Sequence, residues 1–216
     1  AAGVTVIPGV EVTVHWQAVP LHLLLYGEAV QSPVIANLLA RGRDAINTWV
    51  RVRVPELPHL DARARLLGSP HPLTVNDLVR AARECSVLKD PHEAARFVIA
   101  IQPDDPPGLA LSEVARTALE VGAVPVLAHP MRKGALPRGL DLDSINTLLD
   151  DVPAILGIEV VHPRHPQGAR DALTSLGAPR AILVTAGSDS HGPARASPPF
   201  SWPEDYARDF LERIRN

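Results

Sequence analysis

Two short turns of the sequence contain side chains that could bind a metal ion. Asp189 and His191 stand two residues apart, just after a predicted strand at Ala181–Thr185. His129 follows a second predicted strand, Val124–Ala128. In α/β barrels the carboxyl ends of the strands meet at a shared mouth, where they present the side chains of the active site. A carboxylate and imidazoles in such a place suit a hard or borderline divalent cation.

Two more candidate ligands lie near the N-terminus. Glu11 stands in a valine-rich strand, where alternate residues share a face, so that Glu11, Thr13 and His15 point the same way. A carboxylate buried among valines is costly unless it is paired or bound to a metal, although an exposed edge strand would also accommodate it. His22 lies in the next predicted strand, Leu21–Tyr26, where a hydrogen-bonded core histidine is the alternative.

These candidates combine carboxylates and imidazoles without a thiolate. Such a set suits Mn, Zn or Fe in a hydrolytic site. The single cysteine, Cys85, excludes a disulfide framework and a cysteine-based zinc site. The predicted ligands are Glu11, His22, His129, Asp189 and His191.

Alternating strands and helices are expected to position these residues. From Ser112 onward the pattern is regular, which is typical of a parallel α/β arrangement. The middle of the chain is rich in predicted helix and has no obvious strand, and its stretch Arg51–Pro72 reads as irregular. The expected helices are Pro33–Val50, Thr74–Ala82, Ser112–Leu119, Asp143–Leu149, Pro166–Leu176 and Pro203–Ile214, with a further strand at Ile155–Val161.

The composition excludes several classes of protein. The 216 residues are 46% hydrophobic with a formal net charge of −3, which gives no positive field for general nucleic-acid binding. No apolar run approaches the roughly 20 residues that span a bilayer. Without a recognisable signal peptide, we expect a cytoplasmic protein that does not contact a membrane.

The order of the candidate motifs resembles that of the PHP family (polymerase and histidinol phosphatase). The matching blocks are Ile7–Glu11, Leu21–Tyr26, Leu127–Pro130 and Gly187–Gly192. Members of this family are metal-dependent phosphoesterases on a distorted seven-stranded β/α barrel. The resemblance therefore implies an α/β fold of the distorted (β/α)7 PHP-barrel type, formed by residues 1–33 and 102–216, with a helical insertion at 34–101.

The resemblance also implies roles for the candidate ligands. Glu11 would bridge two metal ions, and His22 and His129 would bind one of them. Asp189 would lie near the pair, and His191 would bind a third ion. An intact family member holds up to three divalent ions.

A further resemblance is to the branch of the family that acts on nucleotides or short RNA ends. It rests on the run Ile158–His165, and it implies that His165 lies close to a substrate phosphate with Arg164 beside it. Arg132 and Lys133 after the His129 motif, and Arg195 after the last motif, could also contact phosphate oxygens. Solvated loops are the alternative explanation for these cations.

The family's opening His-x-His motif, its Ser-Asp-Gly motif and a later Asp-His motif are not found in the sequence. The first residues, Ala1–Gly3, resemble the end of a helix, so we expect a barrel truncated at its N-terminus.

The predicted function is hydrolysis of a phosphate ester of a small molecule, a nucleotide or a short nucleic-acid end. A metal-activated water would attack phosphorus with the help of Glu11 and Asp189. Two alternatives stay open: a degenerate, non-catalytic PHP-like domain, and a metal hydrolase of the amidohydrolase type. The sequence leaves the oligomeric state, the substrate and the metal open.

Overall fold

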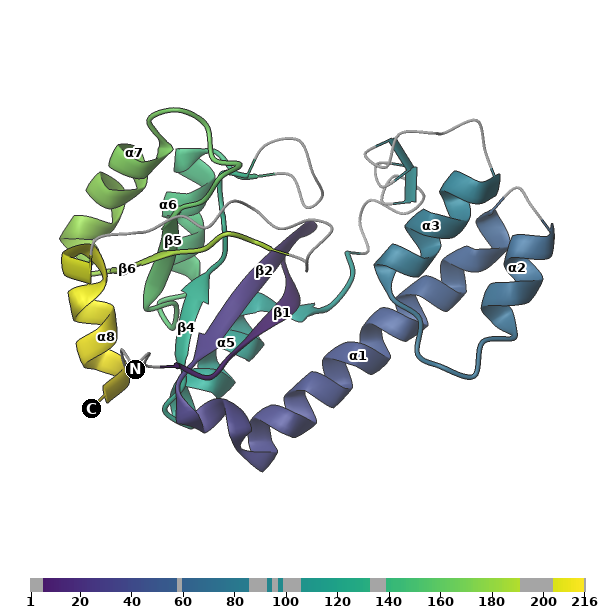
Figure 1. The fold of residues 1–216 in the computed structure, drawn as a ribbon, viewed down its shortest axis with the longest axis horizontal. Helices are drawn as coiled ribbons and strands as arrows, with labels where there is room; N and C mark the ends of the chain where they lie inside the picture. The colour runs from purple at the N-terminus through teal and green to yellow at the C-terminus, as the bar shows by residue number, and fades with distance from the viewer. Residues whose placement is uncertain are drawn as a thin grey trace, which may run out of the picture.

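A computed structural model describes residues 6–57, 60–85, 93–94, 97–98, 106–132, 139–190 and 204–215. Within these ranges the chain forms a mixed α/β structure (Figure 1). The strands are β1 (Gly9–Trp16), β2 (Val19–Tyr26), β3 (Leu109–Ala110), β4 (Val124–Leu127), β5 (Gly157–Val161) and β6 (Leu183–Ala186). The helices are α1 (Pro33–Arg53), α2 (Leu60–Leu67), α3 (Val75–Cys85), α5 (Leu111–Glu120), α6 (Leu142–Asp151), α7 (Ala169–Gly177) and α8 (Arg208–Arg215).

The six described strands form one sheet in the order β3-β1-β2-β4-β5-β6. Neighbouring pairs are parallel except for those of β2, which runs antiparallel to both β1 and β4. The parallel arrangement predicted from Ser112 onward is therefore confirmed for β4, β5 and β6, whereas β2, which precedes that range, is antiparallel to its neighbours. A tight turn causes the difference, because Trp16 pairs with Val19 across a two-residue hairpin in which Gln17 has a φ of 53°.

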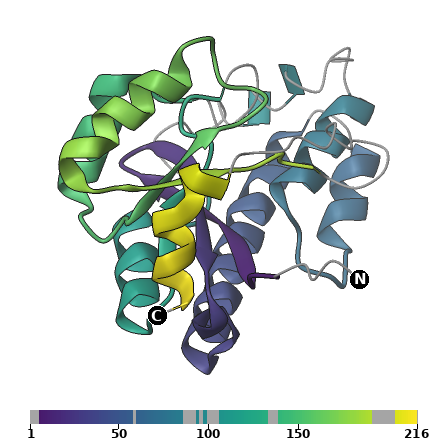
Figure 2. The same cartoon turned by 60° about the vertical axis from the view of Figure 1, so that its left-hand side comes forward.

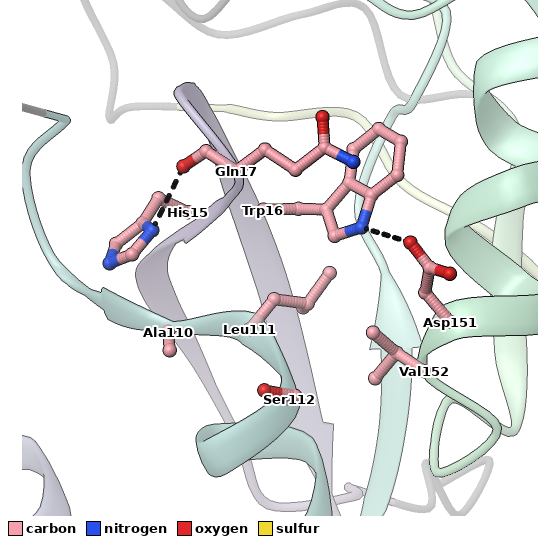
Figure 3. A pocket seen from close by; sticks show the side chains of 8 residues that line it. All are labelled: His15, Trp16, Gln17, Ala110, Leu111, Ser112, Asp151 and Val152. Atoms are coloured by element: carbon pink, nitrogen blue, oxygen red, sulfur yellow. Dashed lines mark hydrogen bonds between the residues drawn. The ribbon is translucent and has the colours of Figure 1, made fainter. Parts of the chain in front are cut away.

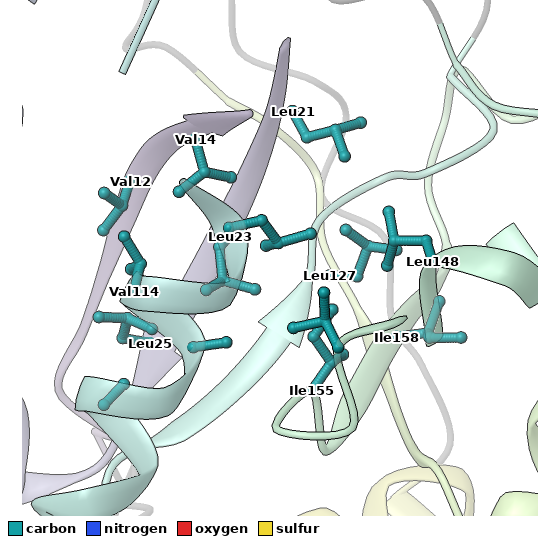
Figure 4. Close-up of a cluster of buried hydrophobic side chains, with 14 of the residues drawn as sticks. Val12, Val14, Leu21, Leu23, Leu25, Val114, Leu127, Leu148, Ile155 and Ile158 are labelled. Carbon is teal, nitrogen blue, oxygen red and sulfur yellow. The ribbon is translucent and has the colours of Figure 1, made fainter. Parts of the chain in front are cut away.

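One face of the sheet holds the main hydrophobic core (Figure 4). The predicted alternation on β1 is confirmed, since Val12 and Val14 are buried on this face and Glu11 lies on the other. Leu21, Leu23 and Leu25 of β2 alternate in the same way. Helices α5 and α6 contribute Val114, Ala118, Ile145 and Leu148 to the same cluster.

The opposite face is divided between an apolar part and a polar part. In the apolar part, Phe210 of α8 packs with Val124 and Val126, and its ring meets that of Tyr26 edge-on at 5.1 Å. Figure 2 shows α8, in yellow, in front of the strands. The polar part of the same face includes Glu11 and His22, so α8 leaves that part of the sheet available for chemistry.

A second apolar cluster lies in the helices that follow β2. It joins the C-terminal half of α1 to α2 and α3, to the right of the sheet in Figure 1. The expectation of irregular structure at Arg51–Pro72 is wrong for α2 and for the end of α1. Arginines hid the helical spacing of apolar residues in this stretch, because an arginine stem can pack in a core as an apolar side chain does. Arg53 is fully buried, with its guanidinium 3.7 Å from the centre of the Trp49 ring. The boundaries 1–33, 34–101 and 102–216 stay a prediction.

Among the described helices, none combines the length and the apolar character needed to cross a bilayer.

A candidate metal centre

Three of the predicted ligands converge on the polar part of the sheet. Oε1 of Glu11 lies 2.6 Å from Nδ1 of His22 and 3.4 Å from Nε2 of His129. The two ring nitrogens are 3.3 Å apart. Among the described residues, these three form the one group of acidic, histidine or cysteine side chains whose ligand atoms all lie within 4.8 Å of one another.

Strand pairing explains why they meet. Glu11 pairs with Leu24, and Thr13 pairs with His22, so Glu11 and His22 stand on neighbouring strands with their side chains on the same face. His129 follows β4 directly, and the backbone N–H of Ala128 donates to the carbonyl of His22 at 3.1 Å. This hydrogen bond places the His129 turn beside β2.

The electrostatics of the group favour an ionised carboxylate. Hydrogen bonds from His129 and His22 hold the pKa of Glu11 well below its usual range, although burial opposes them. Burial lowers the pKa of His129, against the attraction of Glu11. A neutral imidazole beside a carboxylate is the protonation state that a divalent cation requires.

The distances suit a cation. A tetrahedral zinc site with bonds of about 2.0–2.1 Å has neighbouring ligand atoms roughly 3.3–3.4 Å apart. Two of the three separations in the group already match that spacing, and the Glu11–His22 separation would have to lengthen. Two imidazoles and one carboxylate are a donor set of catalytic zinc sites, where a fourth position stays open. The residues present therefore fit a divalent ion.

Asp189 makes a different contact. Its carboxylate accepts a hydrogen bond from Nη1 of Arg132 at 3.0 Å, and both side chains are less than 10% exposed. It also lies 3.8 Å from Nε2 of His162. Asp189 is not part of the three-residue group, and its role as a ligand and that of Arg132 toward phosphate stay predictions.

A row of histidines extends from the group. The ring of His162 lies between those of His129 and His165, with centroid separations of 5.1 and 5.4 Å. Nδ1 of His162 accepts from the backbone N–H of Arg164 at 3.1 Å, which assigns the ring proton to Nε2. Burial lowers the pKa of His162 to about 4, and burial also lowers that of His165. The Nδ1 atom of His165 faces the carbonyl of Val160 at 3.2 Å, and the proposed phosphate contacts of His165 and Arg164 stay predictions.

Glu159 lies beside the metal group although the sequence patterns did not predict it there. This β5 residue is 4% exposed, and its Oε2 accepts from the backbone N–H of His129 at 2.8 Å. Burial raises its pKa to about 7; the hydrogen bond from His129 opposes the rise, and the carboxylates of Glu11 and Asp189 add to it. A glutamate flanked by buried Ile158 and Val160 is the same signal that identified Glu11. His162 was also missed as a member of the site.

Three predicted site residues lie outside the described residues. These are the metal ligand His191 and the phosphate contacts Lys133 and Arg195.

A cavity of about 210 Å³ lies at the end of the β1–β2 hairpin (Figure 3). Nε1 of Trp16 donates to the carboxylate of Asp151 at 3.0 Å across it. None of the three residues of the metal group lines this cavity.

Comparison with models of protein families found no match, and comparison with curated proteins found none either. Two solved structures share the fold. One is a protein from Bifidobacterium adolescentis inferred to be a metal-dependent phosphoesterase, with a TM-score of 0.66 and 22% identity over 96% of this chain and 76% of that chain. The other is an amidohydrolase from Chromobacterium violaceum with bound sulfate and no metal, with a TM-score of 0.70 and 21% identity over 96% of this chain and 77% of that chain. The chain therefore has a fold that is found among metal-dependent hydrolases.

Proposed function

We propose that this chain is a metal-dependent hydrolase that cleaves phosphate esters. The observation that supports it best is the convergence of Glu11, His22 and His129, because it joins a complete donor set for one divalent ion to a fold shared with hydrolases. We further propose that the sheet belongs to a PHP-type barrel, with the helices at 34–101 as an insertion. Mn, Zn or Fe suits the donor set.

The three side chains divide the work of holding the ion. The imidazoles of His22 and His129 would supply nitrogen donors, and the carboxylate of Glu11 would supply the negative charge that offsets the charge of the cation. An ion held there would supply a Lewis acid and would lower the pKa of a coordinated water toward neutrality. Because its pKa is depressed, Glu11 keeps its charge at any working pH.

Groups beside the ligands suit a phosphate ester. His162 and Arg132 both lie beside Asp189, whose carboxylate is 3.8 Å from Nε2 of His162 and 3.0 Å from Nη1 of Arg132. Donors of this kind neutralise charge that develops on phosphoryl oxygens. The Chromobacterium violaceum structure holds a bound sulfate, which is a tetrahedral anion as phosphate is. We therefore propose a phosphorylated small molecule, a nucleotide or a short nucleic-acid end as substrate, with Asp189, His165 and Arg164 near it.

Hydrolysis of a C–N bond is the second candidate. The amidohydrolase with a TM-score of 0.70 favours it, and a strand-borne His and carboxylate set would serve either reaction.

The test is an assay of the protein after chelator treatment and reloading with Mn²⁺ or Zn²⁺. The substrates are p-nitrophenyl phosphate, a mononucleotide, an oligonucleotide with a terminal phosphate, and an amide. We expect metal-dependent release of phosphate. Glu11→Gln should reduce the rate at least about 100-fold, which corresponds to about 2.7 kcal/mol of transition-state stabilisation. Glu28→Gln, a change at an exposed acid just after β2, is the matched control and should retain the rate.

Each outcome has a distinct meaning. Cleavage of the amide alone would favour the second candidate. Metal binding without any turnover would favour the non-catalytic domain. Full activity of Glu11→Gln, or phosphate release that persists after chelation, would refute the proposed site.

A further inference from the structure

The carboxylate of Glu159 contacts the backbone of His129, a residue of the metal group. A carboxylate beside a metal-binding histidine more commonly accepts from the ring nitrogen that does not face the metal. Its Oε2 accepts from the N–H of His129 at 2.8 Å, while the imidazole of His129 points toward Glu11. The side chain comes from β5, the strand beside β4, so the contact links the His129 turn to a neighbouring strand.

The backbone of His129 needs such support. Its φ of 30° lies on the left-handed side of the Ramachandran plot, which is strained for a residue with a side chain. The backbone angles at His129 set the direction of its Cα–Cβ bond, and therefore where Nε2 lies. The carboxyl oxygen that accepts from the N–H fixes that direction, and it does so most strongly when ionised, because hydrogen bonds to carboxylates are shorter and stronger than neutral ones.

The other oxygen of Glu159 is fitted closely against Gly187. A Cβ at position 187 would lie 1.7 Å from Oε1 of Glu159, far inside any permitted contact. The N–H of Gly187 donates to the carbonyl of Val161 at 3.0 Å, which holds this residue against β5. The carboxylate of Glu159 therefore occupies the space that a side chain at position 187 would need.

We infer that Glu159, seated against Gly187, is a positioning residue that fixes the backbone of His129 and so aims its imidazole into the metal group. This inference rests on the proposed metal site and assigns the residue that preorganises it. Glu159 acts through His129, and its effect is to raise the affinity of the folded protein for the metal.

The first test compares three variants of the full chain. Glu159→Leu removes the acceptor, Glu159→Gln retains a carbonyl oxygen at the same reach, and Val160→Ala is the control on the core face of the same strand. Metal affinity is measured by calorimetric titration with Zn²⁺ or Mn²⁺, and folding by thermal unfolding of the metal-free proteins. We expect Glu159→Leu to lower the metal affinity about 10–100-fold, the range found for residues that orient metal ligands. Glu159→Gln should recover most of that loss, and Val160→Ala should lose stability without losing affinity.

A second readout does not need the metal. In the metal-free protein, the amide proton of His129 should resonate downfield in an ¹⁵N–¹H spectrum because it is hydrogen-bonded to a carboxyl oxygen. The signal should move upfield in Glu159→Leu and stay in place in Val160→Ala.

Gly187 provides a cycle that remains informative if Glu159→Leu fails to fold. Gly187→Ala should displace the carboxylate of Glu159 and lower the metal affinity as strongly as Glu159→Leu does. In a Glu159→Ala background the new methyl has room, so Gly187→Ala should then have little effect. Additive effects of Gly187→Ala and Glu159→Ala would overturn the inference.

Failure of the inference on Glu159 can be told apart from failure of the proposed function. If the wild-type chain binds the metal, and folded Glu159→Leu binds it equally well with an unchanged His129 amide signal, Glu159 is not a positioning residue. If the wild-type chain binds no metal, the proposed site itself fails, and the amide signal alone decides whether Glu159 holds the His129 backbone.

Discussion

A single oxygen of Glu11 is shared by two imidazoles. Both ring nitrogens approach Oε1, and in the metal-free protein a ring proton is the only positive partner they can offer it. A divalent cation would take the place of these ring protons, so each imidazole would turn a lone pair to the ion and carry its proton on the other ring nitrogen. The carboxylate would already be ionised when the metal arrives, so no proton would have to leave Glu11.

Acid should destabilise the metal-free protein partly through Glu11. Its pKa in the folded protein is depressed, so the folded state binds fewer protons than the unfolded state as the pH falls below about 4.5, the ordinary value. The stabilisation is therefore complete above about pH 4.5 and is lost progressively below it. The advantage of the wild type over Glu11→Gln in free energy of unfolding should shrink from pH 6 to pH 3, as measured by urea unfolding with EDTA present.

Glu120→Gln, at an exposed carboxylate on α5, is the control for loss of surface charge. A difference between the wild type and Glu11→Gln that is constant across this pH range would contradict the depressed pKa.

The three members of the candidate metal group were predictable from residue type and place, since an ionisable residue in an apolar strand or at its end is costly unless it has a partner. Glu11, His22 and His129 all satisfy that description. The role of Glu159 was not predictable, because its partner is a backbone N–H 30 positions away in the sequence. The Arg132–Asp189 contact joins residues 57 positions apart, and only the folded sheet brings the two loops together.

At the scale of elements, α1 connects two hydrophobic clusters. Ile35 and Leu38 in its first half belong to the main core, whereas Trp49 and Val50 belong to the cluster with α2 and α3. The metal group is built on β1, β2 and the end of β4, so it depends on the first cluster.

A core mutation in α3 should therefore leave the metal group intact. Leu78 is fully buried in the second cluster, and Leu78→Ala should destabilise the region by about 2–5 kcal/mol. Hydrogen exchange should show the loss in α2 and α3, while the affinity for Zn²⁺ stays within about twofold of wild type, a change of roughly 0.4 kcal/mol.

Ile145→Ala, on α6 in the main core, is the comparison. A fall in metal affinity for Leu78→Ala as large as for Ile145→Ala would show that the two clusters are coupled.

Periodicity predicted most elements near the main core. The predicted helices Asp143–Leu149 and Ser112–Leu119 lie within α6 and α5. Periodicity could not give strand direction, because a short hairpin turn and a longer connection leave the same alternation in β2. It also failed where arginine stems serve as apolar surface, as at Arg53.

At the scale of the whole molecule, an ion that binds only the folded state stabilises it by mass action. At a free metal concentration 100 times the dissociation constant the gain is about 2.7 kcal/mol. For a chain of this size that corresponds to a rise of roughly 5–10 °C in Tm. Differential scanning calorimetry with Zn²⁺, and then with excess EDTA, should show the rise and its reversal.

Glu11→Gln should show a much smaller rise in the same experiment. An equal rise in the wild type and in Glu11→Gln would place the stabilising ion elsewhere in the chain.

The β1–β2 hairpin has a kinetic consequence. Glu11 and His22 are on adjacent strands joined by a two-residue turn, and such a unit forms within microseconds. His129 is 107 positions from His22, so the third member of the candidate metal group arrives only after a long loop has closed and β4 has paired with β2. During refolding, full metal affinity therefore marks the time at which the centre of the sheet is assembled.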